Sequence, residues 1–324
     1  MSRAVYEKMK KTCQLPSPTG VAMEILRLAD NEETTIDAIT SAVESDPAIS
    51  ARMLKVVNSP LCGVSRTISS VSSAIRLLGL ATVKSLALGF SLVSNNRSGP
   101  CQAFDHEAFW GESLARAVTA RSVVGHLRTF APDEAFTIGL LSQMGRLALA
   151  TAFPEAYAHA LSLVKGDEAD TLTKIEGEVF EINHNELTAE MMADWKLADI
   201  FRDAARRQDL VVPPDEESKS RASQLARILH LAGSVASVIT EVTVYRDSLT
   251  ALVNEANRLG IKPDLFPQMF DEIGVEWRDA GKIFSLSTRE VPALAEIYTR
   301  SHSRRDKLEG ALKAPQRPTR PLKK

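Results

Sequence analysis

Apolar residues recur along this chain at the spacing of an α-helix, and this periodicity restricts the fold more than any other feature. Val21, Ile25 and Leu28 occupy positions i, i+4 and i+7, and similar stripes recur in later segments. No run in the first half of the chain combines strict apolar–polar alternation with β-branched residues, the pattern of a half-buried strand. Aromatic residues make up only 6% of the composition, which also favours helices over strands. We therefore predict an all-α protein.

Start and stop signals divide the sequence into predicted helices. Asp46-Pro47 places an N-cap acid before a proline at the first helical position, and Asn58-Ser59-Pro60 ends the helix that follows. Another predicted helix ends near Gly79, and a separate apolar helix follows it. Further starts are expected at Ser69 or Ser70, Asp105, Pro132-Asp133, and Asn183 with Glu186 three residues later.

The sequence suggests a cytoplasmic location. The N-terminal residues carry scattered Lys and Arg and no apolar block, so we expect no signal peptide. The most apolar stretch, Leu77–Val93, is interrupted by polar residues and is short for a bilayer span, which needs about 20 apolar residues. We interpret it as a buried helix and expect no membrane span. Cys13, Cys62 and Cys101 lie far apart and form no CxxC motif, as expected of free thiols in a reducing compartment.

Charge is distributed unevenly along the chain. Residues 300–324 contain nine Lys and Arg against Asp306 and Glu309, a net charge of +7, whereas the whole chain carries −2 and the remainder therefore −9. An acidic body repels phosphate backbones, so we expect nucleic-acid contact only through this basic tail. Prolines at threefold spacing in the tail favour an extended, disordered end.

Several motifs occur in an order and spacing that resemble the HDOD domain family, a relative of the HD metal phosphohydrolases. The first half carries a Leu-Pro opening, an Asp-Pro helix start, an Asn-Ser stop and a Leu-Gly helix end. The second half carries FWGESLARA, IGLLSQMGRLALA and INHNELTAEMMADWKL. The four motifs of the first half are Leu15-Pro16, Asp46-Pro47, Asn58-Ser59, and Ala74 with Leu78-Gly79. The resemblance covers roughly residues 15–212.

The resemblance implies a division of the chain into four parts. We expect an N-terminal helical bundle in residues 1–97 packed on an HD-like bundle in residues 98–212. C-terminal helices follow in residues 213–299, and the basic tail in 300–324. The polar segments 95–100 and 212–218 support the two internal boundaries.

HD phosphohydrolases hold their metals with a His, a His-Asp pair and a later Asp. Carried across by the motifs, these positions fall on Glu112, on Ser142-Gln143 and on Gly233, so none keeps its ligand. The sequence supports this conclusion without the family comparison. No His is followed by Asp, and no two histidines lie four residues apart, the spacing of a metal-binding pair on one helix. We therefore expect no metal, no cofactor and no enzymatic activity. Ser142, Cys62 and Cys101 also lack a basic neighbour that would make them nucleophiles.

Two interpretations remain for the polar residues at these positions. They either line a small-molecule pocket left by the ancestral site or satisfy one another inside the bundle, which is the commoner role of buried polar groups. His184 matches the family's motif, but it follows the N-cap Asn183, which favours a structural role. The candidate ligand-binding residues are Glu112, Ser142, Gln143, Arg146, His184 and Gly233.

The resemblance implies a bacterial signal-transduction or regulatory protein without catalytic activity. Its partner would be another signalling protein or a small ligand. No receiver, GGDEF, EAL or kinase-like segment is recognised, so we expect any signal to arrive by non-covalent contact. The alternatives are a sensor of a nucleotide-like second messenger in the vestigial pocket and, with less support, a metal-dependent phosphohydrolase with rearranged ligands.

Overall fold

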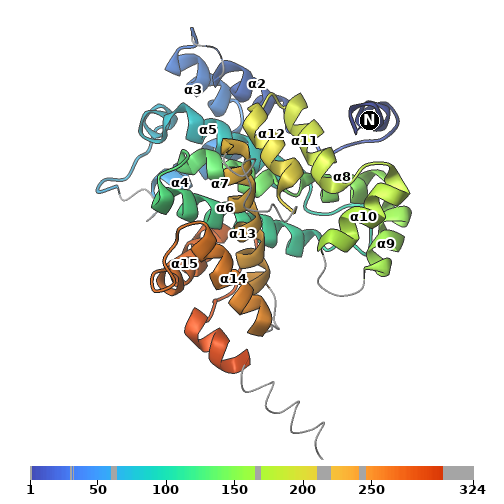
Figure 1. The fold of residues 1–324 in the computed structure, drawn as a ribbon. Coiled ribbons are helices and arrows are strands. Elements are labelled where there is room, and N and C mark those ends of the chain that lie inside the picture. The colour runs from blue at the N-terminus through green and yellow to red at the C-terminus, as the bar shows by residue number, and fades with distance from the viewer. Residues whose placement is uncertain are drawn as a thin grey trace, which may run out of the picture.

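The computed structural model of the protein describes residues 2–29, 31, 33–59, 64–164, 169–209, 220–240 and 246–301, and within these ranges it contains helices but no strand. The first helices are α1 (Ser2–Thr12), α2 (Gly20–Ala29), α3 (Ile36–Glu44), α4 (Pro47–Val57) and α5 (Val71–Asn95). The central ones are α6 (His106–Leu127), α7 (Pro132–Leu141), α8 (Met144–Ala152), α9 (Pro154–Leu163), α10 (Ala169–Phe180), α11 (His184–Asp194) and α12 (Asp199–Arg207). The last are α13 (Arg221–Thr240), α14 (Arg246–Arg258) and α15 (Phe266–Phe284). The predicted all-α class is confirmed (Figure 1).

Local capping interactions fix several helix starts where the sequence predicts them. The Asp46 carboxylate accepts hydrogen bonds from the backbone N–H groups of Ala48 and Ile49, at 2.9 and 3.1 Å. Ser70 and Asp105 cap α5 and α6 in the same way. At α11, Asn183 and Glu186 form a complete capping box, in which each side chain accepts a bond from the backbone of the other. These bonds satisfy N–H groups that have no partner within the helix.

Gly79 bends α5 without ending it. The sequence predicts a helix end here and a new helix after it, whereas the structure keeps one helix through residues 71–95 with a non-helical φ of 77° and ψ of 161° at Gly79. Such backbone angles are almost restricted to glycine, because a residue with a Cβ is strained against its own backbone at this φ. The second part of α5 can therefore reach the main body, while residues on both sides of the bend contribute to the core of the N-terminal bundle.

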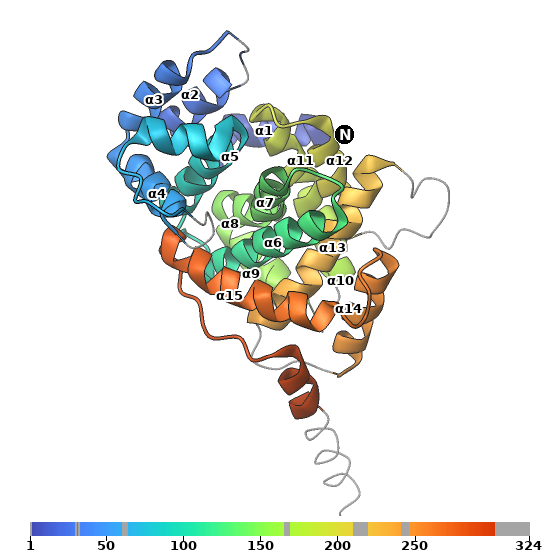
Figure 2. The ribbon, with the colours of Figure 1, turned by 90° about the vertical axis from the view of Figure 1, so that its left-hand side faces the viewer.

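The N-terminal bundle has a hydrophobic core of its own. It is built from α2, α3, α4 and the start of α5, around buried residues such as Ile25, Ile39 and Met53. Figure 2 shows this bundle, in blue, at one end of the molecule, packed on the larger body. The predicted arrangement of an N-terminal bundle on an HD-like bundle is confirmed.

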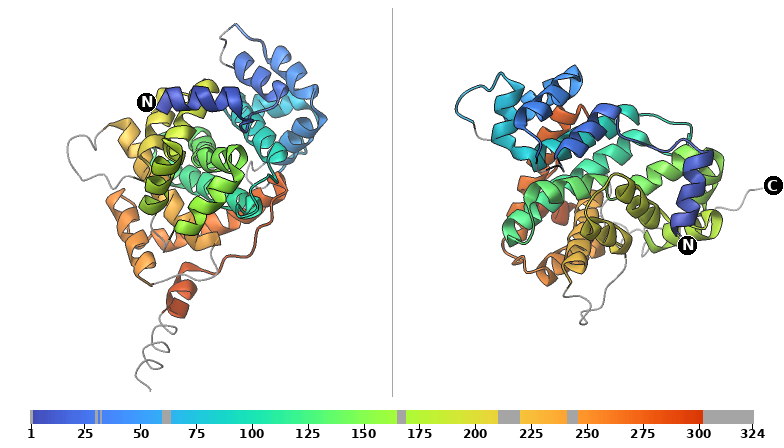
Figure 3. Two further views of the ribbon diagram at one scale, coloured as in Figure 1. Left: turned by 90° about the vertical axis from the view of Figure 1, so that its right-hand side faces the viewer. Right: turned by 90° about the horizontal axis from the view of Figure 1, so that it is seen from above.

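The main body is organised around α6. This helix packs against α7, α13 and α15, and α13 also packs against α12. At the other end, α1 lies beside α11 (Figure 3), where its buried Tyr6 and Met9 join the main core. Because α13 and α15 cover faces of α6, the predicted extra C-terminal helices share the core of the HD-like bundle.

Two described helices, α5 and α13, are long and apolar enough to cross a bilayer by length and composition alone. The most apolar window is 56% buried within the fold in α5 and 67% buried in α13. Their apolar faces therefore serve the protein core, in agreement with the interpretation of residues 77–93 as a buried helix.

Some predictions fall on residues outside the described ranges. These are Cys62, the polar segment 212–218 and the tail from residue 302 onward. Cys13 and Cys101 are free thiols, and Cys101 is buried. The division of the chain at residues 97, 212 and 299 stays a prediction.

Candidate functional site

Glu112 lies half-buried between two arginines in the main body. Its Oε1 atom accepts hydrogen bonds from Arg116, one turn later on α6, with Nε at 3.1 Å and Nη2 at 3.0 Å. Its Oε2 atom is 3.5 Å from Nη1 of Arg146, in the first turn of α8. Burial alone would raise the pKa of Glu112, but the charges of Arg116 and Arg146 outweigh it and hold the pKa below its usual value. Glu112 is therefore ionised and already paired.

Gly233 leaves space on α13 that the Arg116 side chain fills. A Cβ atom at Gly233 would lie only 2.7 Å from Nη1 and 2.9 Å from Nη2 of Arg116. The guanidinium thus occupies the place where any side chain at position 233 would begin. The structure brings Glu112, Arg146 and Gly233 together, and Arg116 is the residue that links them.

Ser142 and Gln143 form the turn between α7 and α8, and both are buried. The Ser142 hydroxyl donates to the carbonyl of Gly139 at 2.9 Å, and the Ser142 carbonyl accepts from Nε2 of Gln208 at 2.7 Å. In the described chain no hydrogen bond connects either side chain with Glu112. The Ser142 carbonyl contacts Gln208, just after α12, and a pocket shared by Glu112, Ser142 and Gln143 stays a prediction.

His184 is buried between two carboxylates. Its Nδ1 atom lies 2.5 Å from Oε2 of Glu176, and its Nε2 atom lies 3.3 Å from Oδ2 of Asp209. Burial alone would lower the pKa of His184, but the two carboxylates outweigh it and raise the pKa to about 9. The ring is therefore an imidazolium at neutral pH, and neither nitrogen has a lone pair for a metal.

A chain of buried polar groups connects His184 with Arg146. The Tyr157 hydroxyl donates to Oε1 of Glu176 at 3.1 Å, while the backbone N–H of His184 donates to Oε2 of the same carboxylate at 2.8 Å. Burial and the charge of Glu176 raise the pKa of Tyr157 above its usual value. Burial alone would lower the pKa of Arg146, but Glu112, Tyr157 and Glu176 raise it. The Nε atom of Arg146 is buried and has no hydrogen-bond partner.

A second network connects the α7–α8 turn with α11, α12 and α13. Nε2 of Gln208 donates to Oδ1 of Asn185 at 2.7 Å, and Nδ2 of Asn185 donates to Asp209 at 2.7 Å. Nδ1 of His230 lies 2.9 Å from the carbonyl oxygen of Gln208. Asp209 has a pKa well below its usual value because the bond to His184 outweighs its burial. These contacts fix the α7–α8 turn, α11, α12 and α13 relative to one another.

The sequence interpretation missed several members of these networks. Arg116 had a usable signal, because it lies four residues after Glu112, the spacing of an ion pair along one helix face. Glu176, Tyr157 and Asp209 had none, because they come from three other segments of the chain. His184 was interpreted as a first-turn residue with a structural role, and the structure gives it two buried ionic partners as well.

The residues present do not fit the divalent metal of the HD phosphohydrolases. Such a metal needs imidazole or carboxylate ligands, which are here replaced by a hydroxyl bonded to a backbone carbonyl, a glycine and a carboxylate neutralised by two guanidinium groups. A cation between Arg116 and Arg146 would also be repelled by both. Among the described residues no group of three or more His, Cys, Asp and Glu is placed to hold a metal ion.

The HDOD domain family matches residues 15–211, which is more than half of the chain. The chain belongs to the HDOD family. Most of the site described above lies within the matched residues, and Gly233 and His230 on α13 follow them. The resemblance predicted from the motifs is confirmed with nearly the same boundaries.

Solved structures are similar to this chain. The response regulator MmoQ of Methylococcus capsulatus str. Bath is 37% identical to this HDOD protein, with a TM-score of 0.51 over 80% of this chain and 99% of MmoQ. A protein named "Putative phosphohydrolase" from Shewanella amazonensis SB2B is 22% identical and has a TM-score of 0.67, over 87% of this chain and 98% of that one. The second similarity shows the shared fold alone.

A curated relative is longer than this HDOD protein. An uncharacterized protein of Treponema pallidum (strain Nichols) is 22% identical over 237 residues, which are 70% of this chain and 43% of the relative. The chain thus matches less than half the length of that relative.

Proposed function

We propose that this HDOD protein is a non-catalytic regulatory protein in signal transduction, acting by binding a protein or a small ligand. The observation that carries the proposal is the replacement of the metal-binding centre by two arginines. Glu112 is held by Arg116 and Arg146, and the Arg116 guanidinium fills the space beside Gly233. The similarity to a response regulator at 37% identity supports the signalling context.

The chemistry of metal phosphohydrolysis explains why this replacement argues against turnover. A bound divalent ion lowers the pKa of its water to about 7 and so makes hydroxide available at neutral pH. Guanidinium groups can bind phosphate, but they remain protonated and take no proton from water. The nearest carboxylate, Glu112, is engaged by both arginines and has a lowered pKa, which makes it a poor general base.

Metal content and turnover of the purified full chain test this proposal. We expect substoichiometric Mn, Fe and Mg by mass spectrometry, and no hydrolysis of p-nitrophenyl phosphate above background when Mn²⁺ or Mg²⁺ is added. Glu112→Gln should leave both results unchanged. Stoichiometric metal together with turnover that Glu112→Gln abolishes would instead establish a phosphohydrolase with rearranged ligands.

A second candidate function is recognition of a nucleotide-like second messenger at the same place. Two observations favour it, namely the pair of guanidinium groups on either side of Glu112 and the buried Nε of Arg146 without a hydrogen-bond partner. Arginine forks suit phosphate groups geometrically.

Calorimetric titration with cyclic di-GMP and with cyclic AMP tests the second candidate. It requires binding in the nanomolar-to-micromolar range that is lost in Glu112→Ala, Gln143→Ala and Arg146→Ala. Glu107→Gln, on the exposed side of the first turn of α6, is the matched control and should bind normally. Absence of binding to the unmodified chain leaves the protein-binding role as the function we propose.

A further inference from the structure

A cavity of about 290 Å³ lies away from the arginine-filled site, where the N-terminal bundle meets the main body. Its walls come from α4, from α5 on both sides of the bend at Gly79, from α6 and α7, and from α15. Small-molecule pockets usually begin near 300 Å³, so its volume suits a molecule of about the size of one amino acid.

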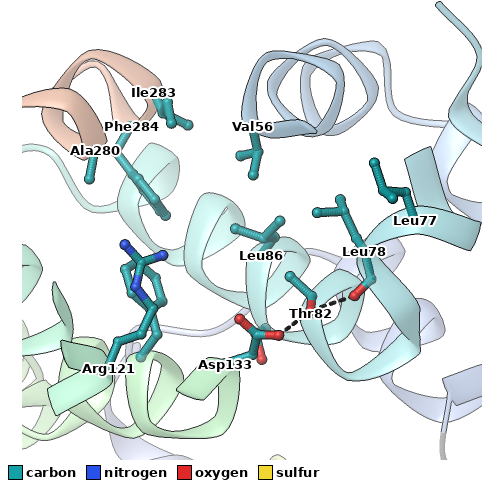
Figure 4. A pocket seen from close by; sticks show the side chains of 12 residues that line it. Val56, Leu77, Leu78, Thr82, Leu86, Arg121, Asp133, Ala280, Ile283 and Phe284 are labelled. Atoms are coloured by element: carbon teal, nitrogen blue, oxygen red, sulfur yellow. Dashed lines mark hydrogen bonds between the residues drawn. The ribbon is translucent and has the colours of Figure 1, made fainter. Parts of the chain in front are cut away.

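Most of the lining is apolar, and two charged side chains stand out. Figure 4 shows Arg121 and Asp133 in the lower part of the view, with Leu86 and Val56 above them and Phe284 facing Arg121. The ion pairs of the described residues include none between Arg121 and Asp133, so neither neutralises the other by direct contact. The cavity therefore offers one cation and one anion beside an apolar wall.

Arg121 has hydrogen-bonding capacity left for a ligand. Its one hydrogen bond among the described residues goes from Nη2 to Oε2 of Glu276, at 3.0 Å. Glu276 is 36% exposed, and a solvent-exposed pair of this kind contributes only about 0–1 kcal/mol. The guanidinium also lies over the ring of Phe136, 5.5 Å from its centroid, which fixes its orientation.

Asp133 is also incompletely satisfied. The hydroxyl of Thr82 lies within hydrogen-bond distance of both the Asp133 carboxylate and the Leu78 carbonyl, and one hydroxyl has a single proton for these two acceptors. Asp133 belongs to the first turn of α7. A protonated amine would supply the donors that Thr82 cannot.

From this charge arrangement we infer that the cavity binds an apolar α-amino acid. Its carboxylate pairs with Arg121, its ammonium group pairs with Asp133, and its side chain packs among Val56, Leu86 and Phe284. A zwitterion satisfies both charges of the cavity at once, whereas a simple amine or a simple acid satisfies only one. The site is independent of the arginine-filled centre, and the inference holds whichever proposed function is correct.

Calorimetric titration of the full chain with L-phenylalanine is the direct test. We expect a Kd below about 1 mM, with affinities at least about tenfold weaker for phenethylamine, 3-phenylpropionate and L-alanine, each of which lacks one of the three recognised groups. Thermal unfolding should shift upward with L-phenylalanine concentration, because the ligand contacts both the N-terminal bundle and the main body. No binding to the unmodified chain, or equal binding of the amine or the acid, would overturn the inference.

Paired variants locate the site. Asp133→Asn and Arg121→Gln should each weaken L-phenylalanine binding at least about tenfold. Glu134→Gln, the neighbouring acid in the first turn of α7 but outside this cavity, should leave it unchanged. Glu276→Gln releases Arg121 from its ion pair and should keep or strengthen binding. This variant therefore shows whether Arg121→Gln weakens binding by removing a ligand contact or by removing the ion pair with Glu276 on α15.

Filling the cavity is the last check. Ala280 lines it from α15 and is buried, so Ala280→Leu should abolish binding by occupying the space of the ligand side chain. Circular dichroism and the melting temperature establish that this variant is folded. If folded Ala280→Leu, or both charge variants, bind L-phenylalanine as well as the unmodified chain, the ligand lies elsewhere and the inference is wrong.

Discussion

His184 carries a positive charge in the interior of the protein because Glu176 and Asp209 flank its ring. Its pKa of about 9 in the folded state lies above the usual value of 6.5. The folded protein therefore keeps a proton that the unfolded chain releases above pH 6.5. The stabilisation is complete below about pH 6.5 and is lost as the pH rises through 9.

The pH dependence of unfolding tests this role of His184. Urea unfolding of the unmodified chain should show a free energy of unfolding that falls by up to roughly 3 kcal/mol between pH 6.5 and pH 9.5. His184→Gln should be less stable at pH 6.5, because two buried carboxylates lose their cation, and should lack most of this decline. His126→Gln, on the exposed end of α6, should keep the decline of the unmodified chain. An equal slope in His184→Gln would contradict the assignment.

At the scale of elements, two glycines allow helices to approach closely enough to build the site. A Cβ atom at Gly139 would lie 2.8 Å from Cα of Ala117, where α7 crosses α6. At Gly145 it would lie 2.0 Å from the backbone oxygen of His184, where α8 crosses α11. The N–H of Gly145 also donates to the hydroxyl of Thr188 at 2.8 Å. These crossings set the position of Arg146 on α8 and of His184 on α11.

Gly145→Ala should therefore be strongly destabilising. The obstacle is backbone rather than a flexible side chain, so we expect the free energy of unfolding to fall by about 3 kcal/mol or more. Gly177→Ala is the matched control, since a Cβ there has nothing within 4 Å and the residue is exposed within α10. It should stabilise the protein by roughly 0.5–1 kcal/mol, as alanine does within a helix. Similar urea midpoints for the two variants would refute the close approach.

At the scale of the whole molecule, α5 contributes to two hydrophobic cores and bends at Gly79. The N-terminal cluster contains Ile75 and Val83, the main cluster contains Leu88 and Phe90, and Leu78 packs against both. The bend at Gly79 thus sets the orientation of the N-terminal bundle relative to the body. It also places the second part of α5 along the wall of the cavity that we assign to an amino acid.

Gly79→Ala should disturb this arrangement through backbone strain alone. A Cβ at Gly79 has open space around it, but the φ of 77° is unfavourable for alanine and costs about 1–3 kcal/mol. Gly20→Ala, at the start of α2 and also in open space, should change stability by less than about 0.5 kcal/mol. Urea unfolding compares the two, and small-angle scattering reports whether the N-terminal bundle reorients. Unchanged stability of Gly79→Ala would mean that the bend does not require glycine.

The sequence alone determined the features that depend on neighbours along the chain. Asp46 with Pro47 and Asn183 with Glu186 mark helix starts because a cap needs residues only two or three positions apart. Helical periodicity fixed the fold class for the same reason, whereas the prediction that Glu112, Ser142-Gln143 and Gly233 replace the metal ligands rests on the family resemblance. The ion pair of Glu112 with Arg116 could have been predicted from its spacing.

Only the tertiary structure decided which distant groups meet. Glu176, His184 and Asp209 come from three segments of the chain, and the contact between Arg146 and Glu112 depends on how α8 and α6 are placed. The cavity with Arg121 and Asp133 likewise exists only because the bend at Gly79 and the packing of α15 bring five helices together. Periodicity shows which face of a helix is buried, but the crossing of two helices is set by packing across the whole core.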